Sequence, residues 1–457
     1  MIASNGVVDG PLFGGVARFG FPMVVAMLLH GSFNLVDAFF IGGMDDARDP
    51  LAAVGNCDPL LMIVVVFANG IATATVAMIA RAKGAGREAD MRRVTGQSIV
   101  LVLLISAVFG VSGAVFAREI GYAMGARGNV LELTAQYLEL MFAGTFAMIV
   151  LLQLTSILRG AGDARGPTII LITASLLNVI WDPILIYGLW GAPELGLMGA
   201  GWATIAARLV GCALALILCL RSRFQVFPKR GEWHIDGGLL RKLVALGIPN
   251  SAQMIVRVLA VVGLVALVNH TFTTPEDQSE VAAFGLGIRF DMVAMFIAMG
   301  WGAAASTYVG QNLGARKVRR AQHAAWIAAL CAFMTLLFVT GVAQGMAETL
   351  VGIFAPGEPR VIEIGVEYLG IVSLSYAFAG VGVVISLALN GAGSTRAPAI
   401  IDGLVYGLLI LPAAAILVVG MGLDRKAVWY CVCGGNIVLA MVYVAWFTRG
   451  RWRRIAL

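Results

Sequence analysis

Two short segments of the sequence each combine an amide with a carboxylate at helical spacing. Asn34 and Asp37 are three residues apart, and Asn178 and Asp182 are four apart, so each pair lies on one face of a helix. Carboxylate and amide oxygens are the ligands of hard cations, and a carboxyl group in apolar surroundings can take up and release protons. The spacing predicts an ion site for a proton, or for sodium held by Asp37, Asn178 and Asp182.

The sequence around these residues is apolar throughout. Of 457 residues, 60% are hydrophobic and 13% charged, and the mean hydropathy is +0.89, whereas soluble chains are about 45–50% apolar and about 25% charged. An ionisable group inside a membrane span costs at least about 2.5 kcal/mol, so Asp37 and Asp182 are functional candidates. Pro183 has no backbone N–H and frees the carbonyl of Val179 as a further ligand.

Apolar stretches long enough to cross a bilayer recur along the whole chain. An even number of spans puts both termini on one side, and most Lys and Arg residues fall in the loops of that side, which predicts cytoplasmic termini in a bacterial inner membrane. The net charge of +6 is then explained by topology, and we expect no nucleic-acid partner. The twelve predicted spans are 14–41, 52–80, 94–117, 130–158, 166–190, 196–220, 240–269, 281–310, 322–345, 361–389, 397–420 and 427–448.

The chain repeats itself. Leu158–Ile170 and Leu389–Ile401 agree at eight of thirteen positions, and Gly20-Phe-Pro22 is echoed by Gly247-Ile-Pro249. The fold prediction is therefore an all-α membrane protein with twelve spans in two six-helix lobes, related by a pseudo-two-fold axis along the membrane normal. Two such lobes can rock about a central cavity, which favours a secondary transporter over an enzyme. The predicted domains are 1–220 and 240–457, with a cytoplasmic linker at 221–239.

The acids are not part of the repeat. At the repeat offsets, Asp37 corresponds to Leu264, and Asp182 corresponds to Ala413. Duplication of a scaffold therefore does not account for the two acids, and this asymmetry favours a function for them.

Of the charged residues in the spans of the second half, Arg289 and Glu367 are assigned to span ends, and Arg257, Asp291 and Asp402 remain as candidates. They could form a buried ion pair or triad whose members satisfy one another, because an unpaired buried arginine is very costly. The other interpretation is a gate or a second protonatable site.

Taken together, these features resemble the multidrug and toxic compound extrusion (MATE) family, and within it the DinF-type branch. The resemblance covers nearly the whole chain. The segments that carry it are Gly20-Phe-Pro22, Val36–Gly42, Leu51–Gly55, Leu158–Asp163 with its copy, Leu177–Ile184 and Gln311–Ala315.

The resemblance implies efflux of cationic amphipathic small molecules in exchange for protons or sodium. It implies a first-lobe cation site at Asn34, Asp37, Asn178, Asp182 and Thr204. Thr204 matches when Gly191–Glu194 is counted as a loop insertion.

The resemblance also implies a bend of the first span at Pro22. We expect a monomer in the lipid membrane that needs no cofactor beyond the coupling ion.

Three other classes of protein fit the sequence less well. A lipid-linked precursor or polysaccharide flippase of the same superfamily often has about fourteen spans and a cationic cavity, which twelve spans with deep acids do not favour. An intramembrane enzyme needs a nucleophile with a base, or a metal set, and the sequence shows neither. A channel would leave the repeat unexplained.

Overall fold

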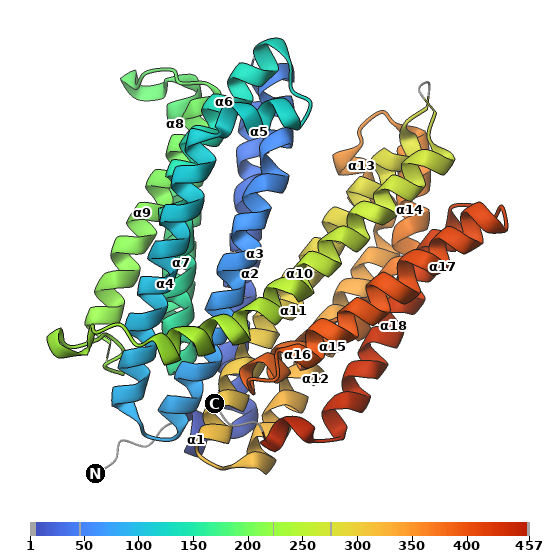
Figure 1. The fold of residues 1–457 in the computed structure, drawn as a ribbon. Helices are drawn as coiled ribbons and strands as arrows, with labels where there is room; N and C mark the ends of the chain where they lie inside the picture. Colours follow the sequence, from blue (N-terminus) through green and yellow to red (C-terminus); the bar gives the residue numbers. More distant parts are fainter. Residues whose placement is uncertain (1–5, 45–46, 223, 275–276, 455–457) are drawn as a thin grey trace. The chain divides into compact units, whose positions relative to one another are not determined.

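The computed structural model describes residues 6–44, 47–222, 224–274 and 277–454 (Figure 1). Every regular element in these ranges is helical, and twelve helical stretches are long and apolar enough to cross a membrane. The prediction of an all-α membrane protein with twelve spans is confirmed.

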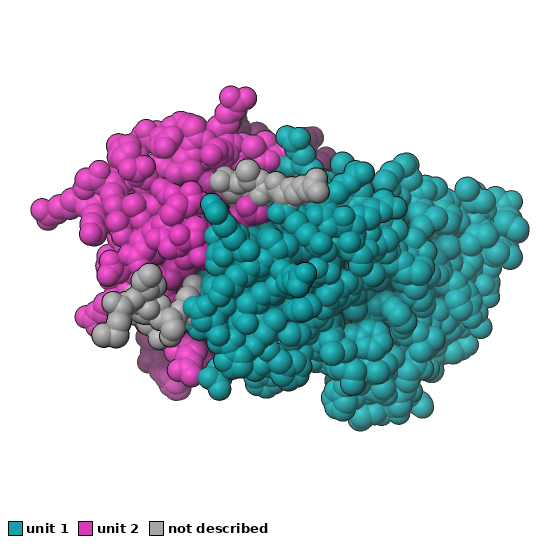
Figure 2. Space-filling model, turned by 90° about the horizontal axis from the view of Figure 1, so that it is seen from below, with its two compact units in different colours: residues 1–24, 249–457 teal, residues 25–248 magenta. Residues whose placement is uncertain are grey.

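The chain forms two compact units, coloured separately in Figure 2. Unit 1 comprises residues 1–24 and 249–457, and unit 2 comprises residues 25–248. Both boundaries fall inside long helices, α2 (Leu12–Gly42) and α10 (Gly237–Phe272), close to Pro22 and Pro249. The repeated Gly-x-Pro motif therefore marks both places where the chain passes from one unit to the other.

Unit 2 contains the end of α2 and the beginning of α10. Its other helices are α3 (Arg48–Gly84), α4 (Glu88–Val115), α5 (Ala117–Ala123), α6 (Gly128–Ala143), α7 (Thr145–Ala161), α8 (Arg165–Tyr187) and α9 (Leu197–Leu220), with short 3-10 turns at Leu189–Gly191 and Arg230–Glu232.

Unit 1 contains the beginning of α2 and the remainder of α10. Its other α-helices are α1 (Gly6–Asp9), α11 (Ser279–Gly314), α12 (Val318–Gly345), α13 (Ala347–Phe354), α14 (Pro359–Val372), α15 (Tyr376–Gly391), α16 (Arg396–Asp402), α17 (Leu411–Ala415) and α18 (Lys426–Thr448). Short 3-10 turns lie at Ser373–Ser375 and Arg451–Arg454, and π-helical segments at Gly403–Ile410 and Ile416–Gly420.

Several predicted spans are not single α-helices. The span predicted at 130–158 consists of α6 and α7, which meet at Gly144, where a Cβ atom would collide with the side chain of Ile205 on α9. The span predicted at 397–420 alternates between α- and π-helical turns around Pro412, which has no N–H to donate to the helix.

The linker between the spans of the two halves is held against α4 of unit 2. Arg92 Nε donates to both carboxylate oxygens of Glu232, at 3.0 and 2.9 Å. Gln97 Nε2 donates to the carbonyl of His234 at 2.8 Å, while its Oε1 accepts the backbone N–H of Asp236 at 3.1 Å. These bonds make the linker an ordered part of unit 2.

Because of the Arg92–Glu232 contact, the order of the linker depends on pH. The hydrogen bond from Arg92 holds the pKa of Glu232 below its usual 4.5, so the contact is complete above that pH and is lost as the pH falls through the lowered pKa. We expect Glu232→Gln to speed hydrogen exchange of linker amides 224–236 several-fold at pH 7. Once the pH has fallen below the lowered pKa, the parent should exchange like the variant. Equal exchange at pH 7 would contradict this.

Candidate functional site

Helices α2, α8 and α9 of unit 2 bring four of the predicted site residues together. Figure 1 shows α8 and α9 side by side, and the two helices pack along their length. Asp37 comes from α2, Asn178 and Asp182 come from α8, and Thr204 comes from α9. All four side chains are buried. We call them the polar cluster.

Two hydrogen bonds fix α2 against α8 on either side of the polar cluster. Ser175 Oγ donates to the carbonyl of Leu29 at 3.3 Å, and Tyr187 OH donates to the carbonyl of Phe40 at 2.5 Å. At the start of α9, Gly199 lies so close to the Leu185 carbonyl on α8 that no Cβ atom would fit. These contacts set the depth at which the three helices meet.

The amide nitrogen of Asn178 is at the centre of the polar cluster. It lies 3.2 Å from Asp37 Oδ1, 3.0 Å from Asp182 Oδ1 and 3.2 Å from Thr204 Oγ1. The Thr204 hydroxyl donates to Asp37 Oδ2 at 3.0 Å. Since an amide NH2 carries two hydrogens, it cannot fully satisfy three acceptors.

Two acceptor oxygens of the cluster have no hydrogen-bond partner among the described residues. They are Asp182 Oδ2 and Asn178 Oδ1, and both are buried. The carboxyl groups of Asp37 and Asp182 also lie within hydrogen-bonding range of each other. A buried acceptor without a donor is costly, and two ionised carboxylates at this range repel. The arrangement is therefore short of one hydrogen or one positive charge.

Arg208 lies one helical turn from the cluster. Asp37 and Phe33 are four residues apart on α2, as are Thr204 and Arg208 on α9, so the two pairs occupy neighbouring levels. Thr204 contacts Asp37 at one level, and the Arg208 guanidinium lies over the Phe33 ring at the next, 5.4 Å from its centroid. Arg208 interacts electrostatically with Asp37.

Two more unit 2 residues interact electrostatically with Asp37. Tyr137 on α6 is buried, and Asp58 on α3 is exposed. No spacing rule connects Arg208 on α9, Asp58 on α3 or Tyr137 on α6 to Asp37 on α2, so the sequence alone gave these residues no place in the site.

The remaining predicted residues of the first half have separate positions. Pro22 and Pro183 both lie inside continuous helices, α2 and α8. The Asn34 side chain lies outside the part of the chain that the structure describes. The predicted roles of these three residues stay predictions.

In unit 1 the structure joins two of the three predicted charged residues. Arg257 Nε on α10 donates to Oδ2 of the buried Asp402 at 2.5 Å. Asp402 also accepts from Gln253 Nε2 at 2.9 Å and, through Oδ1, from Tyr443 OH at 2.6 Å. The Asp402 carboxylate is thus compensated by one cation and two neutral donors.

Asp291 has a different set of partners. Its Oδ2 accepts a hydrogen bond from Tyr368 OH and its Oδ1 accepts one from Tyr376 OH, both at 2.7 Å. Among the described residues these tyrosines, and not Arg257, are its hydrogen-bond donors. Neither tyrosine was predicted, because they lie on α14 and α15, far from Asp291 in the sequence.

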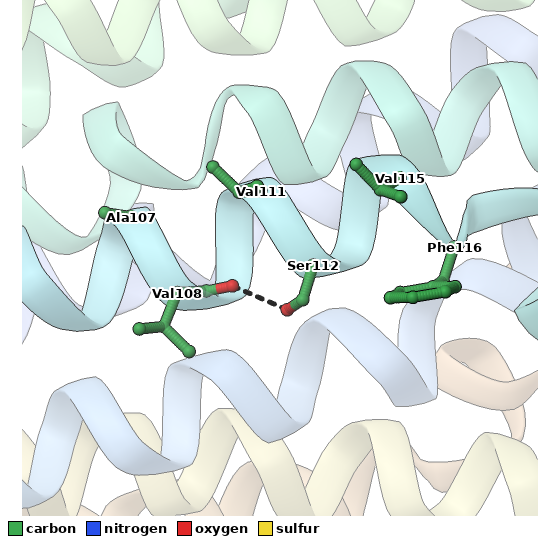
Figure 3. A pocket seen from close by; sticks show the side chains of 6 residues that line it. All are labelled: Ala107, Val108, Val111, Ser112, Val115 and Phe116. Atoms are coloured by element: carbon green, nitrogen blue, oxygen red, sulfur yellow. Dashed lines mark hydrogen bonds between the residues drawn. The ribbon is translucent and has the colours of Figure 1, made fainter.

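Other parts of the described chain offer weaker candidates. A shallow hollow along α4 is lined by apolar side chains (Figure 3), and its one hydroxyl, Ser112, donates to the carbonyl of Val108. That surface suits lipid chains. Within the described ranges, no group of three His, Cys, Asp or Glu side chains is placed to hold a metal ion.

Comparison with known proteins gives consistent matches. The sequence profile of the MatE family matches residues 22–184 and 253–416. A "FAD transporter" of Shewanella oneidensis is 26% identical over 421 residues, 90% of this chain and 89% of the relative. The "Probable multidrug resistance protein YoeA" of Bacillus subtilis is 26% identical over 91% of this chain and 89% of its own. The crystal structure of MATE in complex with MaL6 superposes with a TM-score of 0.91 at 24% identity, covering 98% of both chains.

Proposed function

Because the chain belongs to the MatE family of multidrug efflux transporters, we propose that it exports cationic amphipathic small molecules in exchange for protons by alternating access. Relatives described as multidrug resistance and multidrug export proteins support the substrate class. The proposal places the protein in a bacterial inner membrane as a monomer, with both termini in the cytoplasm.

The observation that carries this proposal is the buried polar cluster with its two unpartnered oxygens. One proton on Asp182 Oδ2 turns an orphan acceptor into a donor and removes one of two repelling charges. Because the unprotonated pair of buried acids is costly, the cluster takes up a proton from one side of the membrane. When the protein changes conformation, the cluster releases this proton to the other side. Coupling requires that proton and substrate favour opposite conformations.

Charge balance calls for one monovalent cation, and the amide nitrogen at the centre of the polar cluster favours a proton over sodium. Asp37 and Asp182 carry two negative charges when ionised, and Arg208 supplies one positive charge in their electrostatic range, so one monovalent cation completes neutrality. The centre of the cluster is taken by the amide nitrogen of Asn178. A metal ion there would face N–H donors, whereas a proton needs only an oxygen to bind.

The role of Arg208 gives a testable difference between ions. We expect Arg208→Gln to leave the cluster one positive charge short, so that sodium competes with protons and a sodium gradient drives dye export. Arg208→Lys keeps the charge and should keep proton coupling. The measurement is dye transport in proteoliposomes under an imposed sodium gradient. A glutamine variant as indifferent to sodium as the parent would exclude Arg208 from ion selection.

The proposed function is tested by reconstituting the purified protein in proteoliposomes. Ethidium transport is followed while a proton gradient and a sodium gradient are imposed separately. We expect transport under the proton gradient alone. If neither gradient drove ethidium transport, the proposal would be contradicted.

A second candidate is export of an anionic compound, because one relative is described as a FAD transporter. The alternative of a flippase for lipid-linked precursors or polysaccharides also needs an anionic substrate. Both require uncompensated basic side chains at membrane depth. Of the arginines inside the spans, Arg257 is paired with Asp402 and Arg208 lies near the polar cluster. The exposed Arg289 on α11 stands two residues from the acid Asp291. The charges therefore favour a cationic substrate, and FAD as competitor in the proteoliposome assay separates the two classes.

A further inference from the structure

Asp291 is a membrane-depth acid that the ion site does not use. It lies within α11, a 36-residue apolar helix of unit 1. Each of its carboxylate oxygens accepts one phenolic hydrogen bond at 2.7 Å, from Tyr368 on α14 and from Tyr376 on α15. Three helices thus converge on one carboxylate.

The hydrogen bonds of Asp291 match the ionised carboxylate. An ionised carboxylate only accepts, so two phenols satisfy one lone pair on each oxygen. With both phenols donating, the pattern is that of the ionised acid, and we take Asp291 to carry a negative charge when substrate binds.

That charge has no cationic partner among the described ion pairs of unit 1. Asp402, the other deep acid of the unit, is paired with Arg257 at 2.5 Å. Arg289 is the nearest basic residue along α11, but residues two apart on a helix do not face each other. A buried charge without a counterion is costly, so Asp291 is poised for a cation that arrives from outside the chain.

The surroundings of Asp291 suit an amphipathic cation. The side chain is half-buried, so it can be reached. Met295, one helical turn away on the same face, is 38% exposed, and methionine adapts to apolar groups of many shapes. The Tyr368 ring packs against Phe284 and Trp429, with centroids 5.7 and 4.8 Å away, so its hydroxyl is held rigidly.

From this geometry we propose that Asp291, held by Tyr368 and Tyr376, binds the positively charged nitrogen of the exported compound. The inference rests on the proposed function and adds to it a place for the charge of the substrate. It assigns proton and substrate to different carboxylates in different units. Exchange then depends on conformational linkage and not on competition for one site.

Dye binding to the purified protein in nanodiscs tests this assignment. Ethidium serves as the cationic probe and N-phenyl-1-naphthylamine as an uncharged one. We expect Asp291→Asn to weaken ethidium binding at least about tenfold and to leave the uncharged probe unaffected. Asp291→Glu should restore most of the affinity. Glu363→Gln, which removes an exposed acid of unit 1, is the matched control and should bind like the parent.

The remaining outcomes separate the two proposals. Parental ethidium affinity in Asp291→Asn, or an equal loss for both probes, would overturn this inference alone. A parent that binds no cationic dye would overturn the inference and the proposed function together. Tyr368→Phe and Tyr376→Phe keep the rings but lose one hydrogen bond each, and each should weaken ethidium binding a few-fold.

Discussion

Replacing Asp37 by asparagine should lower proton-driven dye export by about 100-fold or more. Asparagine has the same size. Its carbonyl oxygen can accept from Asn178, and the Thr204 hydroxyl can turn to accept from its NH2 group, in place of the 3.2 and 3.0 Å bonds to Asp37, so the three helices should stay together. It cannot take up or release a proton. Because coupling requires a change in protonation, the driving force is then lost. The assay is ethidium efflux in everted membrane vesicles after an imposed pH step.

Three controls make the result specific. Asp182→Asn should fail in the same way, because both acids share the missing proton. Asp58→Asn removes an exposed acid that interacts with Asp37 only electrostatically, and it should keep most of the activity. Asp37→Asn should still bind ethidium in nanodiscs, which shows that it is folded. Parental efflux in Asp37→Asn would remove the polar cluster from the coupling mechanism.

The largest effect on stability is expected at Asp402. Asp402→Ala leaves the Arg257 guanidinium inside unit 1 without its carboxylate, and Gln253 and Tyr443 each lose one of their hydrogen-bond acceptors. Removing one partner of a buried pair typically costs about 3–5 kcal/mol. We expect a thermal-unfolding midpoint in detergent many degrees below that of the parent, together with poor expression.

A double variant distinguishes an unpaired charge from a cavity. In Arg257→Met with Asp402→Leu both charges are replaced by apolar side chains, and such replacements are often neutral or stabilising. The double variant should therefore unfold at a higher temperature than Asp402→Ala. If Asp402→Ala unfolded like the parent, the pair would contribute nothing to the stability of unit 1.

The fold was largely predictable because the bilayer imposes a local rule. Apolar runs of spanning length can be read one segment at a time, and all twelve spans recur in the structure. Interruptions inside spans were missed. At Gly144, where α6 and α7 meet, the close neighbour is Ile205 of a different helix, and no property of the segment 130–158 reveals that neighbour.

The residues of the site likewise fall into those whose proximity the sequence predicts and those whose proximity it does not. Asn178 and Asp182 share a face of one helix, so their proximity follows from spacing alone. The approach of Asp37 and Thr204 to Asn178 depends on how α2, α8 and α9 pack, and here the family resemblance supplied what spacing could not. The position of Arg208 near Asp37 depends on the same helix packing.

The second half shows where charge alone is a poor guide. A triad of Arg257, Asp291 and Asp402 is reasonable for three buried charges, since each would reduce the cost of the others. In the structure Arg257 pairs with Asp402, and Asp291 accepts hydrogen bonds from Tyr368 and Tyr376. Tyrosine side chains are uncharged, so a search of the sequence for opposite charges does not find them. The hydrogen bonds from Tyr368 and Tyr376 to Asp291 could therefore be found only in the structure.

The most direct test of the central claim is proton release when substrate binds. Purified protein in weakly buffered detergent solution is mixed with excess ethidium, and the pH change is recorded with a fluorescent indicator. The account predicts that the parent releases about one proton per bound dye, and that Asp37→Asn and Asp182→Asn bind dye but release none. The same release from either variant as from the parent would contradict the claim that these two acids hold the exchanged proton.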